Sequence, residues 1–571
     1  MRLKIIRIVI LLCFCVLALD LVWVQVIKGN FYYHLSVNNR IRVIPLEGLR
    51  GNILDRNGKL LAGSRLSFDV AVIPQDIAGK DALFVFLSEV LDKSKLHLLR
   101  NFQRRRRTPF APVVVAEDVE QSTAMIIEEN RYRFPGLYVQ ESYRRRYPDK
   151  GVGAHLLGYV GKIDSSKIKK LKDYGYTRQS LIGYSGIEEF YDKFLRGKEG
   201  GQQIEVDSRG QQVRLLGLRK PEKGTDIYLT IDHRMQQAAA EALEDKSGAI
   251  VVMDLDSGEI LGMVSAPSFD PNVFSDYKED KARRALFLDS QAPLLNRAVQ
   301  GQYPPGSVFK VVMTAAGLDS GEVDAQTIYH CPGFYKLGQR KFRCAHVHGN
   351  QRIVEALGNS CNVYYYNIGL LLGSDRMHGY ARMFGLGEVT GIDLPAEEKG
   401  RVPSSAGRRK REDRSWYKGD TLNFSIGQGD VLTTPLQVVR LMAAVGRGGR
   451  LPQPFLLKAV GDQPIVTLST SRKVRAADHI FDTVQQGLRT AVTGAQGTAR
   501  MLDMEGFEIY GKTGTAQTAP GKNTHAWFAG YNLQGSRRIA FCVFLEYGGS
   551  SYYAVRVTKN FLRQLKKKDI L

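Results

Sequence analysis

The longest hydrophobic run of the chain lies at its N-terminus. Residues 8–27 are twenty mostly apolar positions, about the length that crosses a bilayer as a helix. Arginine and lysine precede this run, which predicts that residues 1–7 lie in the cytoplasm and that everything after residue 28 lies outside. The pattern therefore predicts an extracytoplasmic protein with a single transmembrane helix.

A cleaved signal peptide is the alternative interpretation of this run. Val16-Leu17-Ala18 resembles a cleavage site. The apolar residues continue for another turn or two beyond Ala18, which favours a retained anchor. Asp20 and Gln25 are unusual within such a segment, and we expect them near the outer interface or against a partner helix in the membrane.

Residues 28–222 show short strand-like runs between Gly, Asp and Asn turns. Asn57-Gly58 stands between two apolar runs, which predicts a hairpin. Ser67–Pro74 predicts a strand, and residues 81–107 predict a basic helical region. The pattern predicts a mixed α/β module without a reaction centre, which would serve as a spacer and docking surface.

The pattern changes near residue 223. A strand at Ile227–Ile231 and a helix at Arg234–Leu243 precede two strands around the turn Asp256-Ser257-Gly258. The C-terminal runs predict three more strands and a closing helix, at residues 508–516, 526–532, 538–546 and 557–566. Residues 223–571 are therefore predicted to be an α+β domain, with a helical lobe packed on an antiparallel sheet.

Length and charge narrow the function classes. A chain of 571 residues should hold more than one domain. The net charge of +22 suits nucleic acid, an anionic membrane or an anionic cell-wall polymer. Zinc-finger spacing, RNA-binding aromatic signatures and basic helices with interleaved aromatics are missing, so nucleic acid is excluded. The basic runs 104–107 and 144–146 are interpreted as solvated faces.

The candidate chemistry starts in the stretch Tyr303–Lys310, which contains an S-x-x-K pattern formed by Ser307 and Lys310. Two prolines precede Ser307 and predict a helix with Ser307 in its first turn and Lys310 one turn on, on the same face. A neutral lysine can take the proton of a serine hydroxyl and make it a nucleophile. Alone, the pattern is weak, because a helix-capping serine gives the same letters.

Two further segments complete a three-part signature. Ser360 and Asn362 form S-x-N, and Lys512-Thr513-Gly514-Thr515 follows a strand-like run. Together with S-x-x-K, these elements are the joint signature of class A β-lactamases and penicillin-binding proteins. The predicted nucleophile is Ser307, with Lys310 as proton acceptor.

The other residues of the signature each have a predicted role. Ser360 relays a proton to the leaving amine, and Asn362 holds Lys310 and the substrate backbone. Lys512 and the hydroxyls of the following threonines suit a terminal carboxylate, and Gly514 lets a peptide approach the strand edge. The backbone N–H groups of Ser307 and Thr515 are predicted to form the oxyanion hole.

The motifs resemble those of the class B penicillin-binding proteins, and most closely the penicillin-binding protein 2 branch. The resemblance rests on Tyr303–Ser307, Ser360–Tyr366, Gly427-Gln428-Gly429 and Lys512–Gln517. It extends over nearly the whole chain, with Arg50–Gly58 similar to the non-catalytic pedestal of that family. Asn362 is a departure, because this branch often carries Asp there.

The resemblance implies a penicillin-binding transpeptidase fold preceded by a pedestal, or dimerisation-like, domain. It further implies an enzyme of the bacterial inner membrane that cross-links peptidoglycan stem peptides from D-Ala-D-Ala donors during elongation. Its implied partners are lipid II-derived glycan, β-lactams and a membrane glycan polymerase of the rod-shape system. The acyl transfer itself requires no cofactor.

A second site is predicted on four residues, Cys331, Cys344, His348 and Cys361. Four such ligands suit tetrahedral zinc, and some members of the penicillin-binding protein 2 branch hold a metal at corresponding positions. A Cys331–Cys344 disulfide with Cys361 free is the alternative, because the predicted compartment permits disulfides. His346 is a competing ligand.

Two other functions use the same residues. A β-lactamase would need a base that hydrolyses the acyl-enzyme, and no convincing loop for such a base is present in the sequence. A membrane-anchored sensor would only bind the ligand, which the intact Ser307, Lys310 and Lys512 disfavour.

Overall fold

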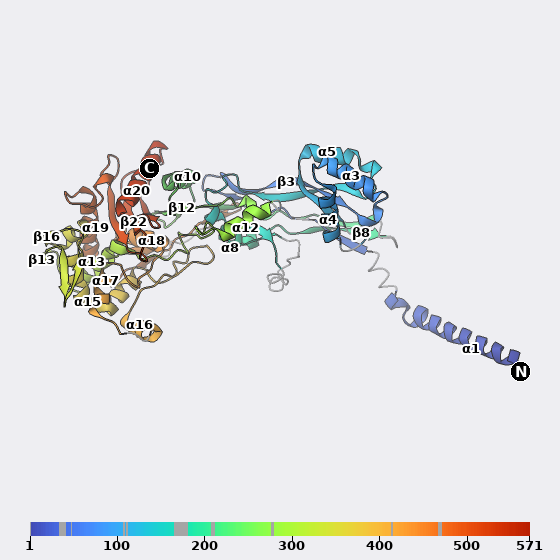
Figure 1. Cartoon of the computed structure of the whole chain (residues 1–571), viewed down its shortest axis with the longest axis horizontal. Coiled ribbons are helices and arrows are strands. Elements are labelled where there is room, and N and C mark those ends of the chain that lie inside the picture. The colour runs from blue at the N-terminus through green and yellow to red at the C-terminus, as the bar shows by residue number, and fades with distance from the viewer. Residues whose placement is uncertain are drawn as a thin grey trace. The chain divides into compact units, whose positions relative to one another are not determined.

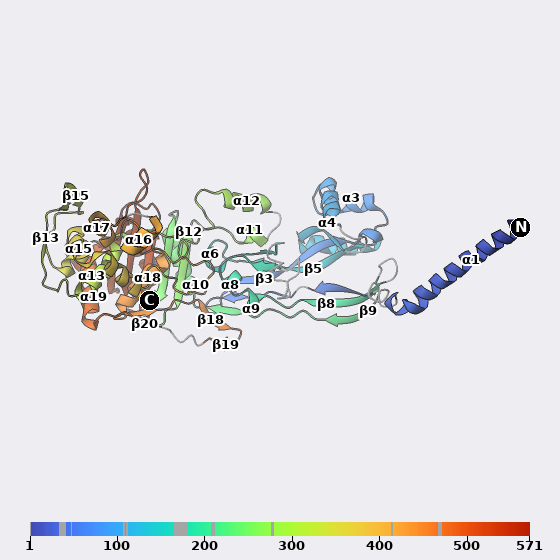
Figure 2. The ribbon, with the colours of Figure 1, turned by 90° about the horizontal axis from the view of Figure 1, so that it is seen from below.

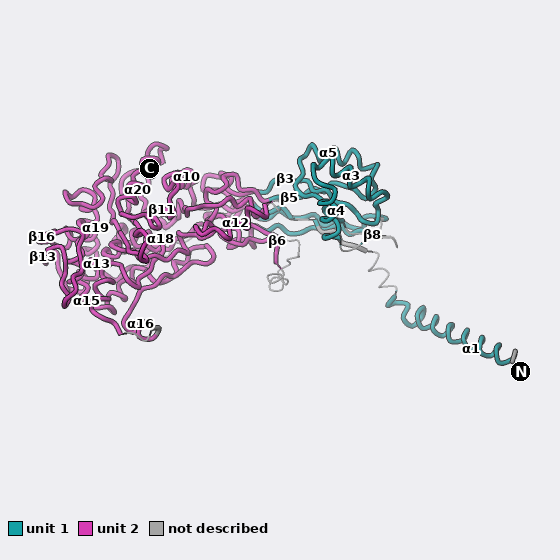
Figure 3. The backbone as a smooth tube through the Cα atoms, in the orientation of Figure 1, with its two compact units in different colours: residues 1–51, 64–144, 196–224 teal, residues 52–63, 145–195, 225–571 magenta. Residues whose placement is uncertain are grey.

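The computed structural model describes residues 2–32, 41–46, 48–106, 109, 112–164, 181–206, 212–275, 279–412, 415–465 and 471–570. The chain forms two compact units (Figure 3). The first comprises residues 1–51, 64–144 and 196–224, and the second comprises residues 52–63, 145–195 and 225–571. The units therefore interleave along the sequence, while the predicted domain limits at 28–222 and 223–571 stay a prediction.

The N-terminal hydrophobic run is helical throughout. It consists of α1 (Arg2–Val22) followed by a π-helical turn, η1 (Trp23–Ile27). Within the described residues, Lys4–Ile27 is the one helix long and apolar enough to cross a membrane, and none of it is buried. This agrees with the predicted span of residues 8–27.

The first unit contributes strands to two sheets. In one, a seven-stranded sheet, β3 (Leu60–Val72) pairs with β4 (Val113–Val119) and β5 (Leu137–Arg146), and α3 (Lys80–Val90) and α4 (Lys95–Arg105) pack their buried side chains against these strands. The other is antiparallel and consists of β1 (Ile41–Leu46), β8 (Gly200–Val206) and β9 (Gln212–Arg219). The strand predicted at 67–74 is confirmed as far as Val72, and the predicted helical region is confirmed as α3 and α4, while residue 107 lies outside the described residues.

The hairpin predicted at Asn57-Gly58 is confirmed. β2 (Ile53–Leu54) pairs antiparallel with the start of β3, and Gly58 in the turn has φ +85°. A positive φ is accessible to glycine at no steric cost, which explains this residue in the turn.

One charge prediction is wrong. Arg145 was expected on a solvated face, but it is 4% exposed and forms an ion pair with buried Glu188 at 2.6 Å. A charged residue is buried only when another group compensates its lost hydration, and Glu188 lies 43 positions away. The local basic run therefore gave no sign of the pair.

The second unit is built on a five-stranded antiparallel sheet with strand order β12-β11-β23-β22-β21. The strands are β11 (Gly248–Asp254), β12 (Ile260–Ala266), β21 (Ile509–Ala516), β22 (His525–Asn532) and β23 (Ile539–Leu545). The predicted strands and their antiparallel arrangement are confirmed. β21 is an edge strand, so one side of it is open to a further strand.

Both faces of this sheet are covered, which explains why its strands are apolar throughout. Successive side chains of a strand point to opposite faces, and Val251 and Ile250 accordingly belong to different core clusters. Helices α10 (His233–Leu243) and α20 (Ser551–Lys567) pack on one face, beside β12 and β22 (Figures 1 and 2).

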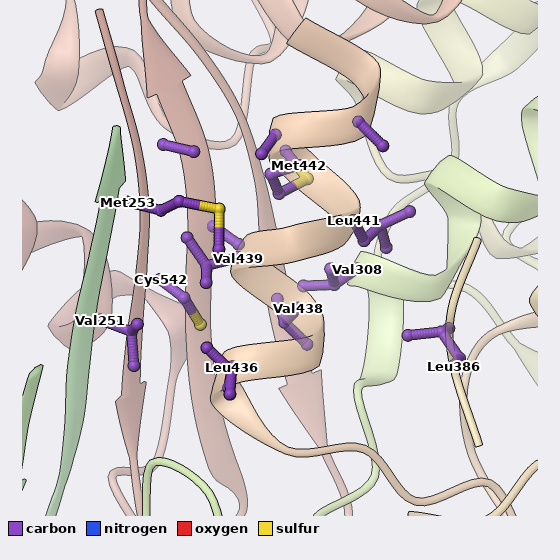
Figure 4. Close-up of a cluster of buried hydrophobic side chains, with 14 of the residues drawn as sticks. Val251, Met253, Val308, Leu386, Leu436, Val438, Val439, Leu441, Met442 and Cys542 are labelled. Atoms are coloured by element: carbon purple, nitrogen blue, oxygen red, sulfur yellow. The ribbon is translucent and has the colours of Figure 1, made fainter. Parts of the chain in front are cut away.

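The opposite face packs against α18 (Pro435–Gly446), a helix that is buried along almost its whole length. Thr434 caps this helix. Its hydroxyl accepts a hydrogen bond from Gln437 N–H at 3.2 Å, and the side-chain oxygen of Gln437 accepts one from Thr434 N–H. Figure 4 shows α18 between the sheet and the helical lobe, with the labelled residues Val251, Met253, Cys542, Leu436, Val438, Val439, Leu441, Met442, Val308 and Leu386.

The helical lobe lies between β12 and β21 in the sequence. Its main helices are α13 (Lys310–Asp319), α14 (Ile353–Gly358), α15 (Asn362–Met383), α17 (Lys418–Ser425) and α19 (Asp478–Thr493). Two small hairpins join α13 to α14, formed by β13 (Tyr329–Cys331) with β16 (Gly349–Gln351) and by β14 (Phe334–Leu337) with β15 (Arg340–Arg343).

Candidate active site

Ser307 lies in a short 3-10 helix, η6 (Gly306–Phe309), and α13 begins only at Lys310. The predicted helix is present, and its first turn, which holds Ser307, is 3-10 rather than α-helical. Gly306 has φ +54°, and its N–H donates to the carbonyl of Gly427 at 2.9 Å. This distant bond fixes the turn that holds the serine.

The strand β21 lies directly against this turn. A Cβ on Gly306 would lie 2.7 Å from the carbonyl oxygen of Thr515, and a Cβ on Gly514 would lie 2.9 Å from that of Pro305. Both distances are too short for a real side chain, so the two backbones approach this closely only because both positions are glycine. Ser307 and Thr515 are thereby brought together from segments more than 200 residues apart.

Lys310 is fully buried, yet its ammonium group has three oxygen partners. Nζ donates to the carbonyl of Ser360 at 2.7 Å, to Asn362 Oδ1 at 2.6 Å and to Ser360 Oγ at 3.3 Å. Burial lowers the pKa of Lys310 to about 8, against the opposing influence of three nearby cysteines. A lysine in this state is neutral in a useful fraction of molecules near neutral pH.

Ser360 and Asn362 occupy the link between α14 and α15. Ser360 has φ +59°, an unusual conformation for a non-glycine residue, and Asn362 begins α15. The Asn362 amide is oriented by Nδ2, which donates to the carbonyl of Arg343 at 3.1 Å. Its oxygen is consequently turned toward Lys310.

Lys512 is also fully buried, on β21. Its Nζ donates to the carbonyl of the next residue, Thr513, at 3.2 Å. Burial lowers the pKa of Lys512 well below its usual value, and the charge of Lys310 lowers it further. The charges of the two lysines therefore interact within the site, while the side chain of Thr515 is exposed.

Two side chains beside the signature were not predicted to belong to the site. Thr498 accepts a hydrogen bond from the Thr513 hydroxyl at 2.8 Å, and Gln428 pairs with β21 at Thr515 and Gln517. Gln428 stands in the Gly-Gln-Gly motif that carries part of the family resemblance, so that motif was the available signal. Thr498 has no sequence signal, because only the fold brings it to β21.

The four predicted metal ligands meet in one place. The ligand atoms of Cys331, Cys344, His348 and Cys361 all lie within 4.8 Å of one another. His348 Nδ1 lies 3.5 Å from each of the Cys331 and Cys344 sulfurs. In a tetrahedral zinc site with these donors, a sulfur and a nitrogen are about 3.5 Å apart, so the residues fit zinc.

Two alternatives to this ligand set were His346 as a ligand and a disulfide between Cys331 and Cys344. The side chain of His346 is exposed and lies outside the four-residue group, so it is not positioned as a ligand. All six cysteines lie in the described residues and are free thiols. Cys344 Sγ accepts from the N–H of Asn362 at 3.1 Å, and hydrogen bonds from Cys361 and His348 lower the pKa of its thiol.

Comparison with known families places the chain. A family model described as the penicillin-binding protein transpeptidase domain matches residues 248–567, more than half of the sequence. This chain belongs to the penicillin-binding protein transpeptidase family. A second model, the penicillin-binding protein dimerisation domain, matches residues 45–229. The predicted fold class, a transpeptidase fold behind a non-catalytic module, is confirmed.

Individual relatives show which branch of the penicillin-binding proteins this chain resembles. Peptidoglycan D,D-transpeptidase MrdA of Acinetobacter baumannii is 32% identical over 98% of this chain and 87% of its own length. The penicillin-binding protein PBP2 of Helicobacter pylori, solved in complex with MreC, is 28% identical, with a TM-score of 0.83 over 93% of this chain and all but 1% of that one. The predicted resemblance to penicillin-binding protein 2 is thus confirmed.

A third relative concerns assembly. A chain of a structure described as the coordination of polymerization and crosslinking by a peptidoglycan synthase complex is 32% identical. The similarity covers 99% of this chain and 97% of that chain, with a TM-score of 0.75. Similarity over this length includes the N-terminal helix as well as the catalytic unit.

Proposed function

We propose that this penicillin-binding protein is a peptidoglycan D,D-transpeptidase of cell-wall elongation and rod-shape maintenance, and a target of β-lactams. The observation that carries the proposal is the buried Lys310, hydrogen-bonded to both Ser360 and Asn362 one helical turn from Ser307. Burial leaves this lysine ready to accept a proton. A merely structural lysine would carry an acidic partner instead.

The acyl transfer follows from these positions. Ser307 Oγ attacks the carbonyl carbon of the D-Ala-D-Ala bond while neutral Lys310 accepts the hydroxyl proton. Ser360 passes a proton from Lys310 to the leaving amine, so D-Ala departs and an ester on Ser307 remains. The amine of a neighbouring stem then attacks the ester carbon and loses a proton to the same relay. An amide bond forms between the stems, the ester C–O bond breaks, and the relay returns the proton to Ser307 Oγ.

Substrate recognition falls to β21. Lys512, with the hydroxyls of Thr513 and Thr515, would bind the terminal carboxylate of the donor, whose charge favours the protonated lysine. Gly514 leaves room for the peptide backbone at the strand edge. The N–H groups of Ser307 and Thr515 would stabilise the oxyanion, consistent with the close approach of their two backbones.

A fluorescent penicillin tests the proposal. We expect one stable label per chain on Ser307, located by mass spectrometry of the labelled peptide, and no label in Ser307→Ala. Ser320→Ala, at the residue directly after α13, should label like the wild type. Labelling that survives in Ser307→Ala, or a label lost within minutes as in a β-lactamase, would contradict the proposal.

The cellular setting is part of the proposal. Residues 1–7 would lie in the cytoplasm, 8–27 would cross the inner membrane, and the pedestal (28–222) and transpeptidase domain (223–571) would lie outside. The partners would be stem peptides on lipid II-derived glycan and a membrane glycan polymerase of the rod-shape system, with no nucleic acid. The structures of relatives with MreC and in a peptidoglycan synthase complex support this assignment.

A structural zinc ion is the second part of the proposal. The chemistry itself uses no cofactor. Cys331, Cys344, His348 and Cys361 would hold the ion, and its role would be to cross-link the hairpin region to Cys361. Because Cys361 stands between Ser360 and Asn362, this cross-link would fix both partners of Lys310.

Metal analysis of the purified full-length chain tests the zinc site. We expect about one zinc per chain in the wild type and in His346→Ala, whose imidazole is exposed, and little zinc in His348→Ala. Loss of zinc should also lower the melting temperature. Zinc-free protein with a mass two protons light would indicate a disulfide and would contradict the assignment.

A further inference from the structure

The side chain of Gln428 covers part of the open edge of β21. The Gln428 side chain donates from Nε2 to the carbonyl of Thr515 at 3.2 Å, and its Oε1 accepts from the N–H of Gln517 at 3.2 Å. β22 is the one strand that pairs with β21 in the described chain, and it lies on the other side. Thr515 and Gln517 therefore direct these backbone groups toward the side where a peptide would add.

The two hydrogen bonds of the Gln428 side chain have the pattern of a residue in a parallel strand. In a parallel pair, one residue donates its N–H to a carbonyl and accepts from the N–H two positions further along the neighbouring strand. Gln428 does the same with Thr515 and Gln517, because a primary amide carries the donor and the acceptor of a peptide group. Its side chain thus acts as a single residue of added strand.

The backbone of Gln428 is fixed while its side chain is free to leave. Its N–H donates to the carbonyl of Asn423 at 2.9 Å, and the Gly427 carbonyl holds Gly306 next to the nucleophile. The side chain is partly exposed, and its hydrogen bonds to described residues are the two to Thr515 and Gln517. Rotation about its side-chain bonds would release the strand edge without moving the serine turn.

A bound donor peptide would use the same hydrogen-bond acceptor as Gln428, the carbonyl of Thr515. If the donor pairs antiparallel with β21, the residue opposite Thr515 exchanges both bonds with it: its N–H donates to the Thr515 carbonyl, and its own carbonyl accepts from Thr515 N–H. The Thr515 N–H is the group proposed to stabilise the oxyanion. The carbonyl under attack and the N–H that would replace Gln428 at the Thr515 carbonyl therefore belong to the same residue of the donor peptide.

We propose that Gln428 is a specificity-determining residue that covers the Thr515 carbonyl until a donor with a peptide N–H at that position displaces it. The inference rests on the proposed function, since it concerns the same donor and the same site. A ligand with this N–H exchanges one hydrogen bond for another at Thr515. A ligand without it gains nothing there and leaves Gln428 in place.

Two β-lactams separate these cases. Benzylpenicillin carries an amide N–H next to its reactive ring, whereas penicillanic acid lacks that amide. The experiment measures second-order rate constants for acylation of Ser307 in the full-length chain in detergent, by competition with a fluorescent penicillin. Both ligands are measured on the wild type, Gln428→Ala, Gln428→Glu and the control Gln326→Ala, which changes an exposed glutamine far from β21 in sequence.

In Gln428→Ala we expect benzylpenicillin to react about 3- to 10-fold faster, the effect of removing two competing exposed hydrogen bonds, and penicillanic acid to change less than 2-fold. Gln428→Glu should raise the ratio of the two rates as well, because a carboxylate cannot donate to Thr515. Gln326→Ala should match the wild type.

The outcomes that overturn the proposal are distinct. An unchanged ratio, or equal slowing of both ligands, would mean that Gln428 only braces β21. Wild-type protein without a Ser307 label would overturn the proposed function, and this proposal with it. A normal label with an unchanged ratio overturns the role of Gln428 alone.

Discussion

Lys310 and Asn362 meet at 2.6 Å inside the catalytic site, and the partner is an amide rather than a carboxylate. An amide accepts the hydrogen bond without adding negative charge, so burial alone dominates and the lysine pKa falls to about 8. Aspartate at this position would change the balance, since an opposite charge favours the protonated lysine. The identity of residue 362 therefore tunes the base.

Asn362→Asp should shift the activity toward alkaline pH. The added carboxylate raises the pKa of Lys310, so less neutral lysine is present at pH 7 and acylation slows by about 10- to 100-fold. The rate of penicillin acylation measured from pH 6 to 10 should recover at high pH. Asn367→Asp, on the same helix but bonded to the Val363 carbonyl, is the control. An unshifted profile in Asn362→Asp would exclude Lys310 as the base.

At the scale of elements, the site depends on a turn packed against a strand. Gly306 precedes the nucleophile with φ +54°, and a side chain there would collide with the Thr515 carbonyl. Gly373, at a kink inside α15, also has a positive φ of +69°, but no atom lies within 4 Å of the place where its Cβ would be. Comparing alanine variants at Gly306 and Gly373 therefore distinguishes the effect of backbone strain from the effect of a steric collision.

Gly306→Ala should reduce penicillin acylation by at least about 100-fold, because the collision moves β21 and with it the oxyanion donor. Gly373→Ala, at φ +69° and ψ 168°, also strains the backbone, by about 1–3 kcal/mol, but its side chain collides with nothing and acylation should stay nearly normal. Rates and melting temperatures are measured for both. Equal acylation by the two variants would show that the close approach has no catalytic importance.

The sheet and the three-part signature could be predicted because their signals are local. Apolar runs such as Gly248–Asp254 are strands covered on both faces, and the motif residues fix their own chemistry. The 3-10 turn at Ser307 could not be predicted, since Gly427 and Thr515 shape it from afar. Burial of Arg145 depends in the same way on distant Glu188.

At the scale of the whole molecule, the chain has a net charge of +22 and two interleaved units, and its described residues include one helix long enough to cross a membrane. Excess positive charge suits a protein that works beside anionic lipid and an anionic cell-wall polymer. Residues 52–63 and 145–195 fold with the catalytic unit, and the predicted boundary near residue 223 stays a prediction. Sequence periodicity does not report such long-range assignments.

The central claim is that Ser307 forms cross-links between stem peptides. The most direct measurement supplies lipid II and a membrane glycan polymerase to the full-length chain, digests the product, and quantifies dimeric stem peptides by mass spectrometry. The account predicts cross-linked dimers and released D-Ala with the wild type, and neither with Ser307→Ala or after penicillin treatment, while glycan synthesis continues. Cross-links that persist in Ser307→Ala, or polymerised glycan without cross-links in the wild type, would contradict it.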